Sequence, residues 1–180
     1  GIVHRIDKDT SGLLIVAKCD EAHLGLAEQI KSHSFTRIYN AIITGNIKED
    51  TITVDAPIGR HPVDRKKMAV IRSAEHKSRE AITHWRALER FGEFTHIECE
   101  LETGRTHQIR VHMASIGHPL LGDIVYGPAK PPCKLQGQTL HAKIIGIKHP
   151  RTGVYLEIDA PLPEYFVNLL KKLENNIHLK

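Results

Sequence analysis

A pair of strand-like segments separated by a very short link constrains the fold of this chain most. Ala81 to Phe91 and Phe94 to Leu101 are both rich in apolar and β-branched residues, and only Gly92 and Glu93 lie between them. A link of this length with a glycine joins two antiparallel strands in a hairpin. The sequence therefore predicts an antiparallel sheet built around this hairpin.

Other segments extend the same pattern. Leu140 to Ile147 and Val154 to Ile158 predict a second hairpin around the turn from His149 to Gly153. Shorter apolar segments predict strands over residues 13–18, 35–45, 51–57 and 68–71, and helical patterns cover about 20–32, 105–115 and 163–175. Because strands outnumber helices and many links are short, we expect an α+β fold, a mixed, mainly antiparallel β-sheet flanked by helices.

Composition narrows the class of protein. The chain has 180 residues, enough for one domain with a sizeable core, and a net charge of +4 that favours a polyanionic partner. Its three cysteines, Cys19, Cys99 and Cys133, are widely spaced and fit no disulfide framework, which favours a reducing, cytoplasmic compartment. No apolar run approaches the roughly 20 residues of a membrane helix, so we expect no membrane partner.

The first fourteen residues contain an unusual polar arrangement. Asp7 stands between a basic pair, His4 and Arg5, and a polar turn that ends at Gly12, after which an apolar run begins. A carboxylate held ionised by a guanidinium can act as a nucleophile or base. A turn before a strand, capped by Asp7 or Asp9, is the structural alternative. Local chemistry leaves both interpretations open for Asp7, and Asp9 is better suited to capping the turn.

A basic loop and many histidines raise two further possibilities. The loop contains Arg60, Lys66 and Lys67, and it is either a solvated hairpin tip or a phosphate-binding segment. The thirteen histidines suggest a metal, but His107 and His112 are five residues apart, which is the wrong spacing for two ligands on one helical face. We therefore expect no metal site.

Four stretches of the chain, taken together, resemble the RluA/RluD-type pseudouridine synthases, and they occur in the family's order. The four stretches are His4 to Asp7 with Thr10 to Leu14, Arg37 to Ala41, Glu102 to His112 with Gly117 to Asp123, and Leu140 to Ala142 with His149–Pro150. The resemblance implies the pseudouridine synthase catalytic fold. It also implies a catalytic-domain fragment over residues 1–180, because that family carries upstream strands, and often a small RNA-binding domain, that this sequence does not contain.

The resemblance also implies roles for individual residues. Asp7 matches the family's catalytic Asp, Arg110 the arginine that pairs with that Asp, and Tyr39 the tyrosine that lies against the target base. Arg5 matches the residue that takes the place of a flipped nucleotide, and Leu140 the apolar residue beneath the tyrosine ring.

Arg105 is expected to contact RNA phosphate or to support the structure near the helix start. The basic loop (Arg60, Lys66 and Lys67) is expected to contact RNA phosphate. Arg105 is five residues before Arg110, and two such positions on one helix do not face the same carboxylate. The implied activity is isomerisation of uridine to pseudouridine in structured RNA, without a cofactor. Large-subunit ribosomal RNA is the expected substrate. A non-catalytic RNA-binding or ribosome-assembly module that retains the fold is the alternative.

Overall fold

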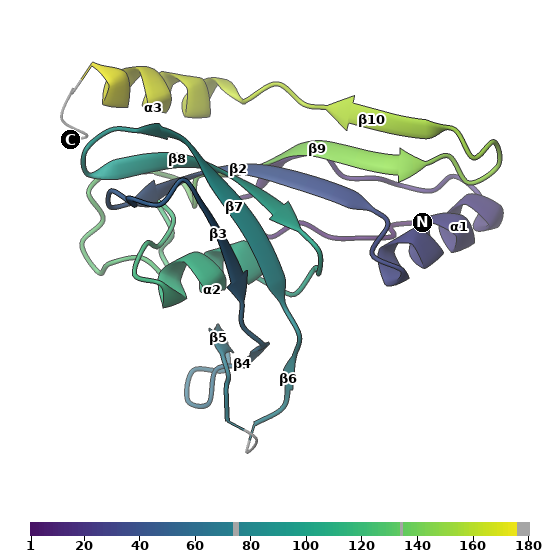
Figure 1. The fold of residues 1–180 in the computed structure, drawn as a ribbon, viewed down its shortest axis with the longest axis horizontal. Coiled ribbons are helices and arrows are strands. Elements are labelled where there is room, and N and C mark those ends of the chain that lie inside the picture. Colours follow the sequence, from purple (N-terminus) through teal and green to yellow (C-terminus); the bar gives the residue numbers. More distant parts are fainter. Residues whose placement is uncertain (74–75, 134, 176–180) are drawn as a thin grey trace.

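A seven-stranded sheet forms the centre of the molecule (Figure 1). The computed structural model describes residues 1–73, 76–133 and 135–175. The strands of the large sheet are β1 (Ser11–Gly12), β2 (Thr36–Thr44), β3 (Thr51–Asp55), β7 (Ile82–Arg90), β8 (Phe94–Leu101), β9 (Leu140–Lys148) and β10 (Tyr155–Asp159). A smaller sheet contains β4 (Ile58–Arg60), β5 (Met68–Val70) and β6 (Ser78–Arg79), and the helices are α1 (Asp20–Lys31), α2 (Gln108–Ser115) and α3 (Glu164–Glu174).

The large sheet is antiparallel except at one edge. Its strands follow the order β1-β9-β2-β8-β7-β3, and β10 also pairs with β9. Only β1 runs parallel to its neighbour, with Ser11 opposite His141. β7 and β8 form the predicted hairpin, and β9 and β10 form the second one. The predicted class, a mixed and mainly antiparallel α+β fold, is confirmed.

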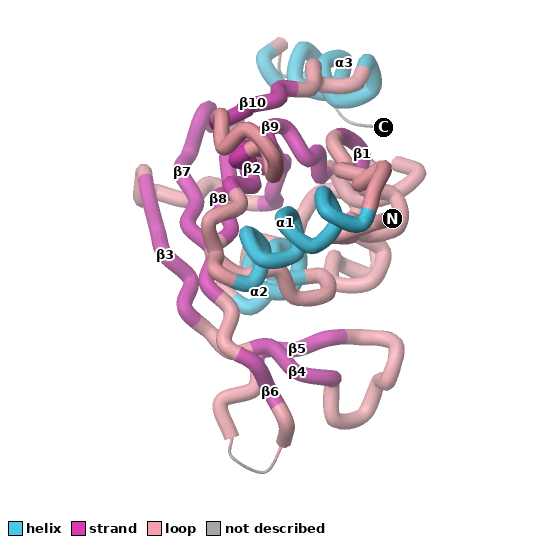
Figure 2. Tube along the Cα trace, turned by 90° about the vertical axis from the view of Figure 1, so that its right-hand side faces the viewer, coloured by secondary structure: helices cyan, strands magenta, loops and turns pink. Residues whose placement is uncertain are grey.

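Helices cover the two faces of the central strand β2. Alternate residues of a strand point to opposite faces. Ala41 and Ile43 pack in the same cluster as Met113 of α2, whereas Ile42 packs in a different cluster with Phe166 of α3. Figure 2 accordingly shows α2 and α3 on opposite sides of the sheet. Because β2 is covered on both faces, it provides a rigid base for the side chains that it carries.

The prediction of a strand over residues 13–18 is wrong. Ladder pairing with β9 ends at Gly12, and the following backbone N–H groups find separate partners. The N–H of Leu13 donates to the Ala142 carbonyl at 3.0 Å, whereas that of Ile15 donates to Nε2 of His4 at 2.9 Å. An apolar run alone cannot reveal such a change of partner. Part of this run is uncovered, with Val16 56% exposed.

Helix α1 has the predicted position. Its N-cap residue, Cys19, makes no side-chain capping bond. On this helix Leu24 is exposed, whereas Leu26 is buried. None of the helices among the described residues is long and apolar enough to cross a membrane.

Candidate active site

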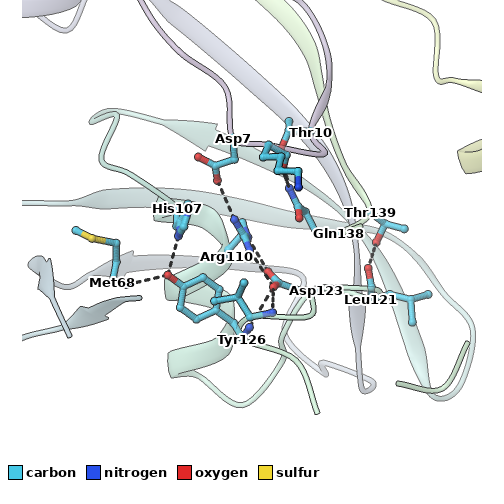
Figure 3. A network of polar contacts seen from close by, with 12 residues as sticks. Asp7, Thr10, Met68, His107, Arg110, Leu121, Asp123, Tyr126, Gln138 and Thr139 are labelled. Atoms are coloured by element: carbon cyan, nitrogen blue, oxygen red, sulfur yellow. Dashed lines mark hydrogen bonds and ion pairs between the residues drawn. The ribbon is translucent and has the colours of Figure 1, made fainter. Parts of the chain in front are cut away.

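The segment that carries Asp7 is clamped to the start of β9. Nε2 of Gln138 donates to the Lys8 carbonyl at 2.7 Å and to Oγ1 of Thr10 at 3.0 Å (Figure 3). Gly12 has a φ of 103°, and a Cβ there would lie 2.2 Å from the Ala142 carbonyl oxygen. Only glycine permits both this backbone conformation and this close approach. The loop around Asp7 is therefore fixed by residues far away in the sequence.

Arg110 lies between two carboxylates. Its Nη1 is 3.5 Å from Oδ2 of Asp7, so the predicted ion pair is present. Its Nε and Nη2 bind the two carboxylate oxygens of Asp123 at 2.7 and 3.0 Å, a bidentate arrangement. The side chains of Arg110 and Asp123 are almost completely buried, and that of Asp7 is 13% exposed. Asp123 thus fixes the guanidinium, and the guanidinium presents its remaining edge to Asp7.

The charges of this cluster stabilise one another. Burial alone would lower the pKa of Arg110, but the hydrogen bonds and charge of Asp123, with the charge of Asp7, outweigh it and raise that pKa. Burial alone would raise the pKa of Asp123, but Arg110 and two backbone N–H donors lower it. Asp123 therefore remains ionised at neutral pH.

Tyr126 connects this cluster to the smaller sheet. The backbone N–H of Met68, in β5, donates to the Tyr126 hydroxyl at 2.9 Å. The same hydroxyl is 2.8 Å from Nδ1 of His107, and the Arg110 guanidinium lies over the tyrosine ring at 5.1 Å (Figure 3). Burial lowers the pKa of His107, which favours its neutral ring, and the tautomer of that ring sets whether Nδ1 or the hydroxyl donates. Contacts therefore run without a break from β5 to the Asp7 side chain.

Helix α2 begins later than predicted, which places Arg105 outside it. The helix was expected from Arg105, but it starts at Gln108, after His107 in a left-handed conformation with a φ of 57°. Oε1 of Gln108 accepts the Arg105 N–H at 2.9 Å and the Thr103 hydroxyl at 2.8 Å, which fixes the turn. Arg110, and not Arg105, reaches Asp7, as predicted, although the helical spacing argument does not apply to Arg105.

A pocket of about 420 Å³ opens beside Asp7. The predicted site residues that line it are Asp7, Tyr39, Arg5, Arg105 and Leu140. Arg110 lies behind Asp7 and does not line the pocket. Tyr39 is 8% exposed, and burial raises the pKa of its phenol. Asp7 and Tyr39 are thus brought together on one pocket wall, with an ionised arginine behind the carboxylate.

The remaining predicted residues lie elsewhere. Arg60, Lys66 and Lys67 belong to the hairpin between β4 and β5, and none of them lines the pocket beside Asp7. Arg60 lines a separate polar hollow with His61 and Lys77. Among the described residues, no group of three or more His, Cys, Asp or Glu side chains is arranged to hold a metal ion.

Sequence reasoning missed several residues that build the site. Asp123, Tyr126, His107 and Gln138 hold Asp7 and Arg110 in place, yet none was predicted to do so. A signal existed for Asp123, because it ends the third stretch of residues that resembles the family. Its pairing with Arg110 crosses a loop, and local sequence patterns do not reveal such a contact.

Comparison with known proteins connects this geometry to a family. The profile of the RNA pseudouridylate synthase family matches residues 1–115. An uncharacterized RNA pseudouridine synthase of Bacillus subtilis, YlyB, is 54% identical over 176 residues, which cover 98% of this chain and 56% of that protein. The ribosomal large subunit pseudouridine synthase D of Pseudomonas aeruginosa is 49% identical over 188 residues, which cover 98% and 57%.

A solved structure agrees with the sequence comparisons. Human RNA pseudouridylate synthase domain containing 1 superposes with a TM-score of 0.76 at 26% identity, covering 96% of this chain and 79% of that one. The chain spans a little over half the length of the two curated relatives that it matches. Because the family profile covers more than half of its residues, the chain belongs to the RNA pseudouridylate synthase family.

Proposed function

We propose that the protein carrying this chain converts specific uridines of structured RNA to pseudouridine, with large-subunit ribosomal RNA as its substrate. The observation that carries the proposal is the Asp7 carboxylate, paired with buried Arg110 and facing a pocket that Tyr39 also lines. The names of the relatives, which include ribosomal large subunit pseudouridine synthases, support the choice of RNA.

The reaction breaks the bond between ribose C1′ and uracil N1 and forms a bond between C1′ and C5. The C5 proton is lost and N1 gains a proton, so the reaction is an isomerisation that needs no redox partner. Asp7 supplies the nucleophile or base, either by adding to the base or by assisting its departure from C1′. Arg110 keeps that carboxylate ionised and oriented, since an opposite charge at contact distance favours the charged form.

The other pocket residues hold and reposition the base. The Tyr39 ring forms a wall for the detached uracil, and its hydroxyl relays the C5 proton. Leu140 belongs to the same buried cluster as Tyr39 and supports the ring from the core side. Arg5, which is exposed at the pocket, takes the place of the flipped nucleotide. Arg105 contacts RNA phosphate.

Replacement of Asp7 by Asn tests the proposal. The amide keeps the shape of the carboxylate but removes its charge and nucleophilicity, so we expect pseudouridine formation to fall at least about a thousandfold. RNA affinity should change little, because phosphate contacts dominate it. Asp9→Asn, a neighbouring carboxylate in the same loop, is the matched control and should keep its activity. Wild-type turnover in Asp7→Asn would remove Asp7 from the mechanism.

The same measurements test the alternative function. If the wild-type protein binds structured RNA tightly but forms no pseudouridine in it, the chain acts as an RNA-binding or ribosome-assembly module. Mapping of pseudouridines in ribosomal RNA from cells that lack the gene would then reveal no missing modification, whereas the proposed enzyme leaves at least one uridine unconverted.

A further inference from the structure

Arg37 is a buried cation without a carboxylate partner. It lies two residues before Tyr39 on β2, and therefore on the same face of the sheet. The residue is 6% exposed, and its hydrogen bonds run from Nη2 to the carbonyls of Leu101 at 3.5 Å and Glu102 at 3.2 Å. Its Nε is buried with no hydrogen-bond partner. Among the described residues, no carboxylate lies within ion-pair distance of this guanidinium.

Such an arrangement is costly unless a ligand completes it. Burial of a charge without a counter-charge is unfavourable, and arginine cannot escape the cost by losing its proton. Burial, and to a lesser extent the charge of Arg105, lowers the pKa of Arg37, yet the group remains charged at neutral pH. The two backbone carbonyls satisfy part of its hydrogen-bonding capacity but supply no negative charge. A ligand with a negative charge would supply the missing counter-charge.

The pocket in front of Arg37 carries an excess of positive charge. Three arginines, Arg5, Arg37 and Arg105, line it, and Asp7 is the only carboxylate among its lining residues. A neutral uracil ring alone would not balance this excess of positive charge. A nucleotide brings one phosphodiester charge on each side of its ribose, which matches the excess. The charge of the lining therefore points to a nucleotide bound together with its backbone.

Gly104 leaves room for the guanidinium. A Cβ at this position would lie 2.2 Å from Nη1 of Arg37, so any larger residue would displace the guanidinium. The next residue is Arg105, whose Nε donates to the Glu80 carbonyl at 2.8 Å. The absence of a side chain at Gly104 therefore lets the buried Arg37 guanidinium lie against the turn that carries Arg105.

We propose that Arg37, together with Arg105, forms a phosphodiester subsite that binds the RNA backbone next to the nucleotide held at Asp7 and Tyr39. This inference rests on the proposed function, because it identifies which part of the RNA substrate the wall of that site recognises. Arg37 supplies donors that the protein leaves unused, and Arg105 lies beside it in the same pocket lining. The subsite anchors the target nucleotide through its phosphate while the base is free to turn.

Replacement of Arg37 by Met tests the subsite, because Met keeps the apolar stem and removes the charge. Loss of one phosphate contact should weaken RNA binding roughly five- to tenfold at 0.1 M salt and should reduce the slope of log K against log salt by about 0.7 to 0.9. Arg86→Met is the matched control: Arg86 is an exposed arginine of β7 that pairs with Glu98. That variant should keep the wild-type slope, and an unchanged slope in Arg37→Met would overturn the subsite.

A measurement on the unaltered protein covers the case in which Arg37→Met does not fold. We expect uridine 5′-monophosphate to shift the NMR signal of the Arg37 Nε–H, and uridine, which lacks the phosphate, to leave it in place. Equal responses to both probes, or none, would reject the subsite. Since the readouts are binding and not turnover, they separate the two proposals. A reduced salt slope in Arg37→Met, with no pseudouridine formed by the wild type, would support the subsite and reject the proposed activity. An unchanged slope, with pseudouridine formed by the wild type, would support the activity and reject the subsite.

Discussion

Two buried arginines lie at the same pocket, and among the described residues only one of them has carboxylate partners. Arg110 is held by the Asp123 carboxylate at 2.7 Å and also pairs with Asp7. Arg37 is equally buried, but its hydrogen bonds run to backbone carbonyls and its guanidinium lies over the Phe35 ring at 5.8 Å, so among the described residues it has no carboxylate partner. The difference divides the site into a side that is preorganised before any ligand arrives and a side whose charge balance awaits the ligand. Catalysis needs side chains that are fixed before the substrate binds. Recognition of a polyanion needs positive charge that the protein has not already neutralised.

Replacement of Asp123 by Asn should have the largest effect, because it removes the carboxylate that fixes Arg110 and leaves that guanidinium paired with Asp7 alone among the described residues. Removal of one partner of a buried ion pair costs about 3–5 kcal/mol. We therefore expect that loss in the free energy of unfolding, measured by urea denaturation, and a large loss of turnover because Arg110 no longer holds its position. Asp64→Asn is the control, since the exposed pair between Asp64 and Lys67 contributes less than about 0.5 kcal/mol. A stability close to that of the wild type would mean that the Arg110 side is not preorganised by Asp123.

The Arg37 side should respond to acid through His4. Burial, and then the charge of Arg37, lowers the pKa of His4 from 6.5 to about 4. The unfolded chain therefore binds a proton at higher pH than the folded one. The stability that His4 contributes is complete above pH 6.5 and is lost as the pH falls toward 4. Because His4 is partly exposed, we expect a loss on the order of 1–2 kcal/mol.

His96 titrates in the same window and must be separated from His4. Burial lowers its pKa to about 4 as well, and burial also lowers the pKa of His107, His112 and His141, so the wild-type protein loses stability from several histidines on acidification. Urea denaturation between pH 4 and 7 should therefore show a smaller acid loss in His4→Gln than in the wild type. In Arg37→Met, NMR titration should find the pKa of His4 closer to 6.5. An unchanged pKa in that variant would show that Arg37 exerts no charge effect on His4.

Tyr126→Phe tests how far the order of the Arg110 side extends. The change removes the hydroxyl that the Met68 N–H and His107 share, but keeps the ring beneath Arg110. We expect a loss of about 1 kcal/mol in unfolding free energy and a lower turnover at saturating RNA. Tyr155→Phe is the control, because its hydroxyl lies exposed on β10, where its hydrogen-bond partner among the described residues is Glu157, two residues away. Turnover equal to that of the wild type would limit the preorganised side to Arg110 and Asp123.

The smallest effect is expected at the hairpin between β4 and β5. Lys66 and Lys67 lie outside the pocket, so their neutralisation by Gln should leave turnover at saturating RNA unchanged. Each phosphate contact that is lost should reduce the slope of log K against log salt by at most about one. An unchanged slope would mean that this hairpin does not contact RNA, which would leave Arg37 and Arg105 as the main cationic contacts.

The parts that the sequence predicted are those that local patterns or recognisable motifs determine. The β7–β8 hairpin followed from its Gly92–Glu93 link, and the pairing of Asp7 with Arg110 followed from the resemblance. What could not be predicted depends on packing between distant segments. The partners of Arg37 come from the end of β8, and the carboxylate that fixes Arg110 comes from a loop after α2.

The clamp on the Asp7 loop has a consequence for how the protein is made. Gln138 and Lys8, which it joins, are 130 positions apart, as are Ser11 and His141, whose side chains are 2.8 Å apart. Contacts between such distant residues form slowly, because a long loop must close before they contribute any stability. Synthesis at about 5–20 residues per second also delivers the Asp7 loop several seconds before its anchor. The Asp7 carboxylate is therefore positioned late in folding, and a nascent chain that ends before β9 exposes the Asp7 segment without the contacts that fix it.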